Sequence, residues 1–161
     1  MVRVSLREFL ATGRFGPLEL GVSRELVEER LGPPDDWDAR SPTHRAARIW
    51  KYGDVELHFA RGGSSLQIIH ADDFDVPSGG ANVELDPWIV SGQLRRRDAE
   101  AELASAGIAF TTRPYVVEPD MDEVRTIGGI SLVFAAEGDT PPGERRLVSM
   151  SSSEAGVTTL R

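Results

Sequence analysis

Three short runs of alternating residues, close together in the chain, constrain the fold most strongly. They read "ARIWKYG", "DVELHFA" and "SLQIIHA", at residues 47–53, 54–60 and 65–71, and each contains β-branched or aromatic side chains. Alternation with a period of two is typical of a strand that buries one face. The stretch "RGGSS" between the last two runs favours a hairpin turn. The pattern therefore predicts antiparallel strands in the first half of the chain.

A capped helix precedes these runs. Ser23 is a good helix N-cap, Gly32 is placed to end the helix, and the two prolines that follow forbid its continuation. We therefore expect a helix over residues 24–31. A shorter helix is expected within residues 5–12, because apolar side chains recur there at helical spacing.

The second half has a similar order of elements. A helix that is capped by Asp98 and runs through Ala106 is expected, followed by strands at "IAFTT", "EVRTIGG", "ISLVFAA" and "RLVSMSS". A shift of 75 positions places Ser23 on Asp98 and Gly32 on Gly107, which suggests an internal duplication. The alternative is two halves of ordinary composition that happen to match.

The Gly-, Pro- and Asp-rich stretch at residues 77–92 predicts a connector between the halves, with one strand near residues 89–90. The first α+β repeat would then span residues 1–76 and the second residues 93–153. Residues 154–161 are expected to form a frayed tail.

The stretch "LGVSRELVEERLGPPD", followed by "IWKYGDVELHF", resembles the recurring pattern of the BamE-like (SmpA/OmlA) family. That pattern has a Gly, a helix cap, a Val-containing helix, Leu-Gly-x-Pro, and Trp-x-Tyr leading into a hairpin. The match covers about residues 20–59. In the second half Arg125, Thr126 and Ile127 stand in place of Trp-x-Tyr.

A tandem of two such units is similar to the β-lactamase inhibitory protein fold. The resemblance implies an α+β protein of two tandem helix-helix-antiparallel sheet units, with helices on one side and an open concave face that docks on a partner protein. The secreted inhibitor needs an export signal and disulfides, and we expect neither here, so inhibition of an extracellular β-lactamase is not expected.

Composition narrows the classes of partner. Cysteine is absent, which removes disulfides and thiolate sites and is typical of a reducing cytoplasm. A net charge of -8 argues against nucleic-acid binding. No apolar run approaches the ~20 residues of a membrane helix, and the charged N-terminus does not resemble a signal peptide. We therefore expect a cytoplasmic protein with a neutral or basic partner.

The sequence contains few residues in patterns typical of catalysis. We therefore expect that the protein is not an enzyme and that it binds no cofactor and no metal. The histidines His44, His58 and His70 show no spacing typical of a metal pair. If His70 lies across the hairpin from Glu56 and His58, a polar cluster becomes conceivable. A small-ligand-binding protein or an enzyme that uses these three side chains is the alternative hypothesis.

Acidic and aromatic residues are the better candidates for a binding surface, because large aromatic side chains dominate interfaces and acidic loops attract basic partners. The competing interpretation is a solvated acidic loop. The residues predicted to bind a partner are Asp35, Asp36, Trp37, Asp38, Glu56, His58, Asp72, Asp73 and Asp75.

These features predict a non-catalytic protein-binding module. Its expected role is that of a cytoplasmic immunity or inhibitor protein that neutralises a bacterial toxin or enzyme by docking its concave sheet and acidic loops. The expected partner is a protein, such as a basic toxin domain. A structural subunit is a third hypothesis. The sequence does not indicate an oligomeric state.

Overall fold

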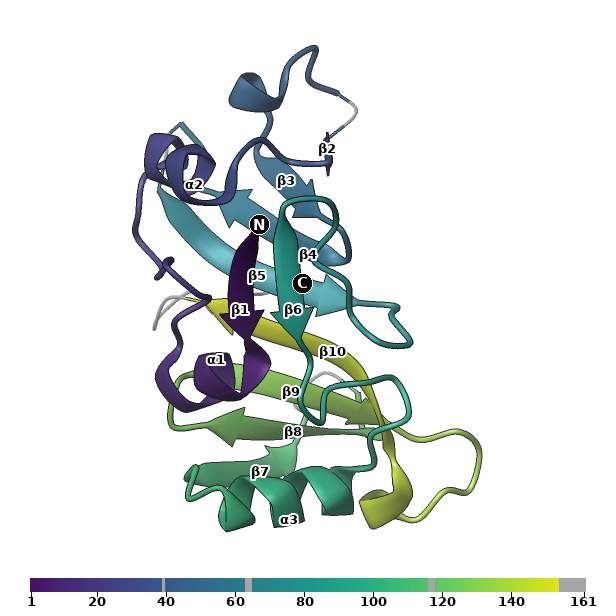
Figure 1. The fold of residues 1–161 in the computed structure, drawn as a ribbon. Helices are drawn as coiled ribbons and strands as arrows, with labels where there is room; N and C mark the ends of the chain where they lie inside the picture. Colours follow the sequence, from purple (N-terminus) through teal and green to yellow (C-terminus); the bar gives the residue numbers. More distant parts are fainter. Residues whose placement is uncertain (39, 63–64, 116–117, 154–161) are drawn as a thin grey trace.

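One large sheet dominates the molecule. The computed structural model describes residues 1–38, 40–62, 65–115 and 118–153. Eight strands form an antiparallel sheet in the order β2-β3-β4-β5-β10-β9-β8-β7, while β1 and β6 form a separate parallel pair (Figure 1).

The helices α1, α2 and α3 and the β1–β6 pair lie against the same side of this sheet (Figure 1). The described helices are α1 (Leu6–Thr12), α2 (Arg24–Leu31) and α3 (Arg96–Ser105), with short 3-10 turns η1 (His44–Ala46) and η2 (Pro142–Glu144). The described strands are β1 (Val2–Ser5), β2 (Asp36–Trp37), β3 (Ile49–Tyr52), β4 (Val55–Phe59), β5 (Leu66–Asp72), β6 (Val83–Asp86), β7 (Phe110–Pro114), β8 (Met121–Thr126), β9 (Ile130–Ala135) and β10 (Arg146–Ser153).

The predicted helix at residues 24–31 is confirmed as α2. The Ser23 hydroxyl accepts a hydrogen bond from the Leu26 amide at 3.1 Å, and the Gly32 amide donates to the Glu28 carbonyl at 2.8 Å. Gly32 has a φ of +79°, a backbone conformation that favours glycine. Local capping therefore sets both ends of α2.

The predicted N-cap of α3 was wrong by three residues. Its N-cap is Arg95 and not Asp98, which lies in the first helical turn. A tertiary contact explains the difference, since the Arg96 amide donates to the Arg145 carbonyl at 2.9 Å. This bond ties the start of α3 to the start of β10, which no local capping rule can indicate.

The prediction of two tandem helix-helix-sheet units is wrong. The first half contributes α1 and α2, but the second contributes α3 alone among the described residues. Shifting α1 by 75 positions places it on residues 81–87, where β6 lies instead of a helix. β6 pairs with β1, and β5 pairs with β10, so the two halves share one continuous eight-stranded sheet.

The connector contains a strand at a different place from the one expected. β6 covers Val83–Asp86, whereas residues 89–90 are not in a strand. Val83 is buried, and it pairs with Val2 of β1. The chain start and the middle of the sequence are therefore joined by a parallel ladder that the alternation pattern did not reveal. The predicted tail at 154–161 lies outside the described residues.

The core lies between the large sheet and the helices. Val55, Leu57 and Phe59 alternate along β4 and are at most 1% exposed, whereas Glu56 and His58 between them are half-buried and point to the opposite face. This second face, termed the open face, bears Lys51, Glu56, His58, His70, Ser151, Ser131 and Arg125 on neighbouring strands.

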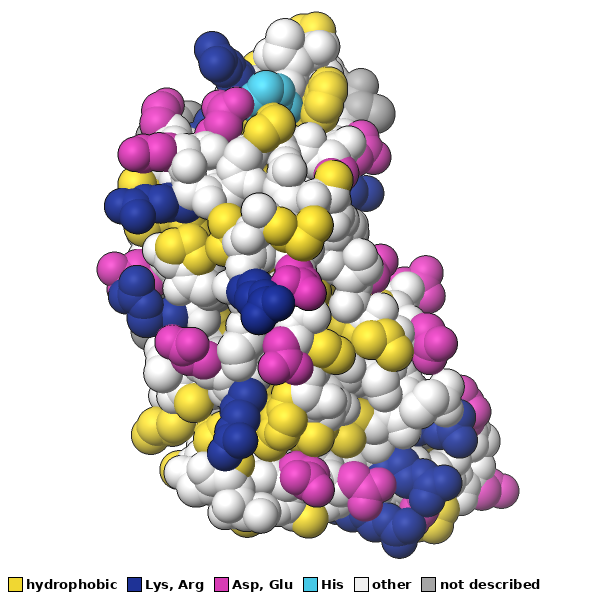
Figure 2. Space-filling view, viewed as in Figure 1, with side chains coloured by type: hydrophobic (Ala, Val, Ile, Leu, Met, Phe, Trp, Pro, Cys, Tyr) yellow, Lys and Arg dark blue, Asp and Glu magenta, His cyan; other side chains and the backbone are white. Residues whose placement is uncertain are grey.

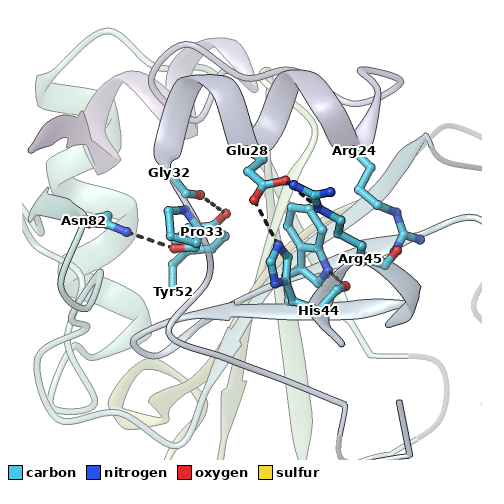
Figure 3. A network of polar contacts seen from close by, with 9 residues as sticks. Arg24, Glu28, Gly32, Pro33, His44, Arg45, Tyr52 and Asn82 are labelled. Carbon is cyan, nitrogen blue, oxygen red and sulfur yellow. Dashed lines mark hydrogen bonds and ion pairs between the residues drawn. The ribbon is translucent and has the colours of Figure 1, made fainter. Parts of the chain in front are cut away.

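Polar contacts fasten the C-terminal end of α2 to the sheet (Figure 3). The buried Tyr52 hydroxyl donates to the Gly32 carbonyl at 2.8 Å, and the Asn82 side chain donates to the Pro33 carbonyl at 2.9 Å.

None of the helices in the described ranges is long and apolar enough to cross a membrane.

The same helix is held along its length by a second set of contacts (Figure 3). Glu28 accepts from the His44 ring at 2.9 Å and lies 3.8 Å from Arg45. Arg24 donates to the Arg45 carbonyl at 2.6 Å, and its guanidinium lies over the rings of Trp50 and Phe59. Burial lowers the pKa of Arg24. Through its contact with Glu28, the His44 ring helps to hold α2 against the sheet.

Alkaline pH tests the Tyr52 contact. Burial, together with the nearby Glu28 and Asp35 carboxylates, raises the pKa of Tyr52 above its ordinary value of 10.0. A phenol that binds its proton more tightly in the folded chain contributes its full stability below about pH 10 and loses it as the pH rises further. We expect the free energy of unfolding, measured by urea denaturation, to fall as the pH rises above about pH 10.

Tyr52→Phe should flatten this fall and cost about 1 kcal/mol at neutral pH, because it removes the ionisable hydroxyl and its hydrogen bond. Tyr115→Phe, at the chain's second tyrosine, is the matched control and should keep the alkaline loss. An unchanged pH dependence in Tyr52→Phe would contradict the assignment.

Candidate docking face

One row of side chains crosses the open face perpendicular to the strands. Strand pairing puts Asp36 opposite Lys51, and Lys51 opposite Glu56. Glu56 in turn lies opposite His70, which lies opposite Ser151. Residues opposite each other in an antiparallel sheet point to the same side. The row therefore places charged and polar groups from five strands on one face.

A surface hollow of about 760 Å³ lies at the β2 end of this face. Two carboxylates, Asp36 and Asp38, border it from the β2 segment, and Glu56 borders it from β4. Lys51 contributes a positive charge, with its Nζ 3.9 Å from a Glu56 oxygen. The remaining described lining residues are Trp37, Arg40, Ser41 and Ile49.

Two predicted residues near this hollow have structural partners. The Asp35 carboxylate accepts hydrogen bonds from the Gly53 amide at 2.9 Å and the Ala81 amide at 3.2 Å. Trp37 is half-buried, with its indole donating to the Ser41 carbonyl at 3.1 Å. Pairing with Trp50 on β3 turns the Trp37 side chain toward the core.

A second hollow of about 700 Å³ lies where β5 ends and β10 begins. Asp72, Asp73 and Asp75 line it, and Asp73 has a φ of +51°. The apolar side chains that line this hollow are Phe74, Leu147 and Val148. Val148 is 41% exposed, because it lies at an irregularity in the β9–β10 pairing. The two predicted groups of aspartates therefore border two different hollows.

The histidines of the open face are paired with carboxylates. His58 lies 2.9 Å from Glu56, and His70 lies 3.2 Å from Asp72. The two rings are 6.5 Å apart between centroids, so the polar cluster suggested by the sequence does form. Within the described ranges, no group of three or more His, Asp or Glu side chains has an arrangement that could hold a metal ion.

The side chains in the β8–β9 part of the open face are more deeply buried than those in the β3–β5 part. Glu123 is 5% exposed, and its two oxygens accept hydrogen bonds from Arg113 at 2.7 Å and Ser131 at 2.6 Å. Ser131 and Val133, on the neighbouring strand β9, are 9% and 6% exposed. This half of the face offers fewer free side chains.

Several residues of the site were not singled out from the sequence. Lys51 could have been found, since it is the chain's one lysine and alternates with Trp50 and Tyr52 along β3. The sequence left open whether Val148 or Met150 faces outward on β10, because the irregular pairing that exposes Val148 depends on the neighbouring strand. Arg40 and Ser41 lie in a loop and depend equally on tertiary placement.

Comparison with family models, with curated proteins and with solved structures gave no match for this chain. The resemblance to BamE-like and β-lactamase inhibitory proteins therefore stays a prediction.

Proposed function

We propose that this chain is a non-catalytic protein-binding module that acts as an immunity or inhibitor protein in the cytoplasm, neutralising a basic toxin or enzyme. The observation that carries the proposal is the open face itself, a sheet surface of mixed polarity with carboxylate-lined hollows at Asp36 and Asp72. Its partner would be a protein with a basic surface.

Two physical arguments support this assignment. The hollows are broad and combine carboxylates with apolar groups such as Ile49 and Val148, which suits the side chains of a protein partner. The net charge of -8 favours fast encounter with a basic partner.

Co-purification tests the proposal. The tagged full-length chain, expressed in its native host, should recover one protein at equal stoichiometry. Asp36→Arg and Asp72→Arg should each reduce its association rate about tenfold at low salt, because each reverses a charge on the docking surface. Glu29→Arg, an equal charge reversal on the exposed side of α2, should have little effect. Recovery of only a small molecule would refute the proposal.

A second candidate is a small-ligand-binding protein or enzyme that uses Glu56, His58 and His70. Their proximity favours it, since Glu56 pairs with His58 and lies directly opposite His70. Neither His58 nor His70 lines the hollows described above. Ligand-detected NMR against a metabolite library tests this function. A ligand lost in His70→Ala but retained in Asp36→Arg would favour it.

A further inference from the structure

Acidic and basic side chains are interspersed on the helix-covered side of the molecule (Figure 2). On the open face the two signs of charge are unevenly distributed. The β2–β5 half carries more acidic than basic side chains, whereas the β7–β8 edge carries two arginines and one glutamate. The acidic half comprises Asp36, Asp38, Glu56 and Asp72 against Arg40 and Lys51, and the basic edge comprises Arg113 and Arg125 against Glu123.

The two arginines of the basic edge differ in their partners. Arg113 is neutralised by Glu123 at 2.7 Å, but Arg125 makes no hydrogen bond or ion pair with any residue in the described part of the chain. Its half-buried side chain points to the open face beside Ser131. Its guanidinium is available there for a carboxylate, which it can bind through two parallel hydrogen bonds.

Strand pairing fixes the separation between the two charge centres. Glu56 on β4, His70 on β5, Ser151 on β10, Ser131 on β9 and Arg125 on β8 lie in one transverse row. Four strand spacings of about 4.8 Å separate Glu56 from Arg125, which is roughly 19 Å along the sheet.

We infer that the protein surface recognised by the open face carries both signs of charge: a basic group over Glu56 and Asp36, and a carboxylate over Arg125 roughly 19 Å away. This inference rests on the proposed function and specifies the partner's chemistry. A uniformly basic surface would place positive charge against Arg125, which costs affinity. The arginine therefore selects against partners that carry only basic groups.

Three synthetic peptides test the inference directly on the full-length chain. One joins four lysines to four glutamates through six prolines, a stiff spacer of roughly 19 Å. The other two replace either the glutamates or the lysines by serines. At low salt the two-sign peptide should bind at least about tenfold more tightly than the lysine-only peptide, because the second contact becomes intramolecular.

Charge variants locate the effect. Arg125→Glu should abolish the advantage of the two-sign peptide without weakening the lysine-only peptide, and Arg125→Gln provides the same test with a smaller perturbation of the fold. Arg30→Glu, the matched reversal on the exposed end of α2, should keep the advantage. Circular dichroism checks that each variant is folded.

The inference is overturned if the two-sign peptide binds no more tightly than the lysine-only peptide, if none of the peptides binds, or if Arg30→Glu removes the advantage as fully as Arg125→Glu. The natural partner is not used in this experiment. Failure of the peptide test and failure of the co-purification test are therefore distinguishable results.

Discussion

Trp50→Ala should lower the free energy of unfolding by about 3–5 kcal/mol, the range for removal of a large buried aromatic side chain. Trp50 is 0% exposed and packs against Phe59 with ring centroids 4.9 Å apart. Its indole donates to the His44 carbonyl at 2.5 Å, and Arg24 lies over its ring. The substitution would leave a cavity between α2 and the sheet and would remove one of the hydrogen bonds to the His44 carbonyl.

Urea denaturation followed by far-UV circular dichroism measures this loss. Trp37→Ala is the matched control, because Trp37 is a tryptophan on the neighbouring strand that is only half-buried. It should cost about 1–2 kcal/mol, in proportion to the smaller apolar area it buries. Equal losses in the two variants would contradict the placement of Trp50 at the centre of this packing.

Asp122→Asn should destabilise the fold by about 2–4 kcal/mol, because it removes the counter-charge of the largely buried Arg145 and leaves Arg96 paired with Glu100 alone. The Asp122 side chain is 9% exposed, and one of its oxygens accepts from Arg96 at 2.9 Å and lies 3.0 Å from an Arg145 nitrogen. These contacts join α3, β8 and the start of β10. The 21% exposure of Arg96 keeps the expected loss toward the lower part of the range for a buried pair.

Glu144→Gln is the control for this variant. Glu144 also bridges two arginines, Arg95 at 3.0 Å and Arg97 at 2.7 Å, but these guanidiniums are 40% and 58% exposed. Solvent screens such pairs, so the loss should stay within about 1 kcal/mol. If Glu144→Gln cost as much as Asp122→Asn in urea denaturation, burial would not be the cause of the difference.

The elements that local patterns predict well are those whose ends are capped or whose side chains alternate cleanly. The helix α2 has its cap and its stop within ten residues, and β4 alternates between apolar and polar side chains. The parallel β1–β6 pair could not be predicted, since its strands are four residues long and about 80 positions apart. Pairings at such separation depend on the whole fold.

The site could be predicted only in part for the same reason. The sequence places Glu56 and His58 on one face of a strand, because they are two positions apart. It cannot place Arg125 on that face, since the β5–β10 pairing joins the two halves of the sheet. Nor can it show that the Asp35 carboxylate is occupied by the Gly53 and Ala81 amides.

Site-specific photo-cross-linking in the native host tests the central proposal, that the open face binds a protein partner. The cross-linking amino acid is placed at Ile49 in the first hollow, at Val148 in the second, and at Glu29 on α2 as the control. Both hollow positions should cross-link to the same protein, and position 29 should give no adduct with it. Adducts from position 29 alone, or none from either hollow, would contradict the proposal.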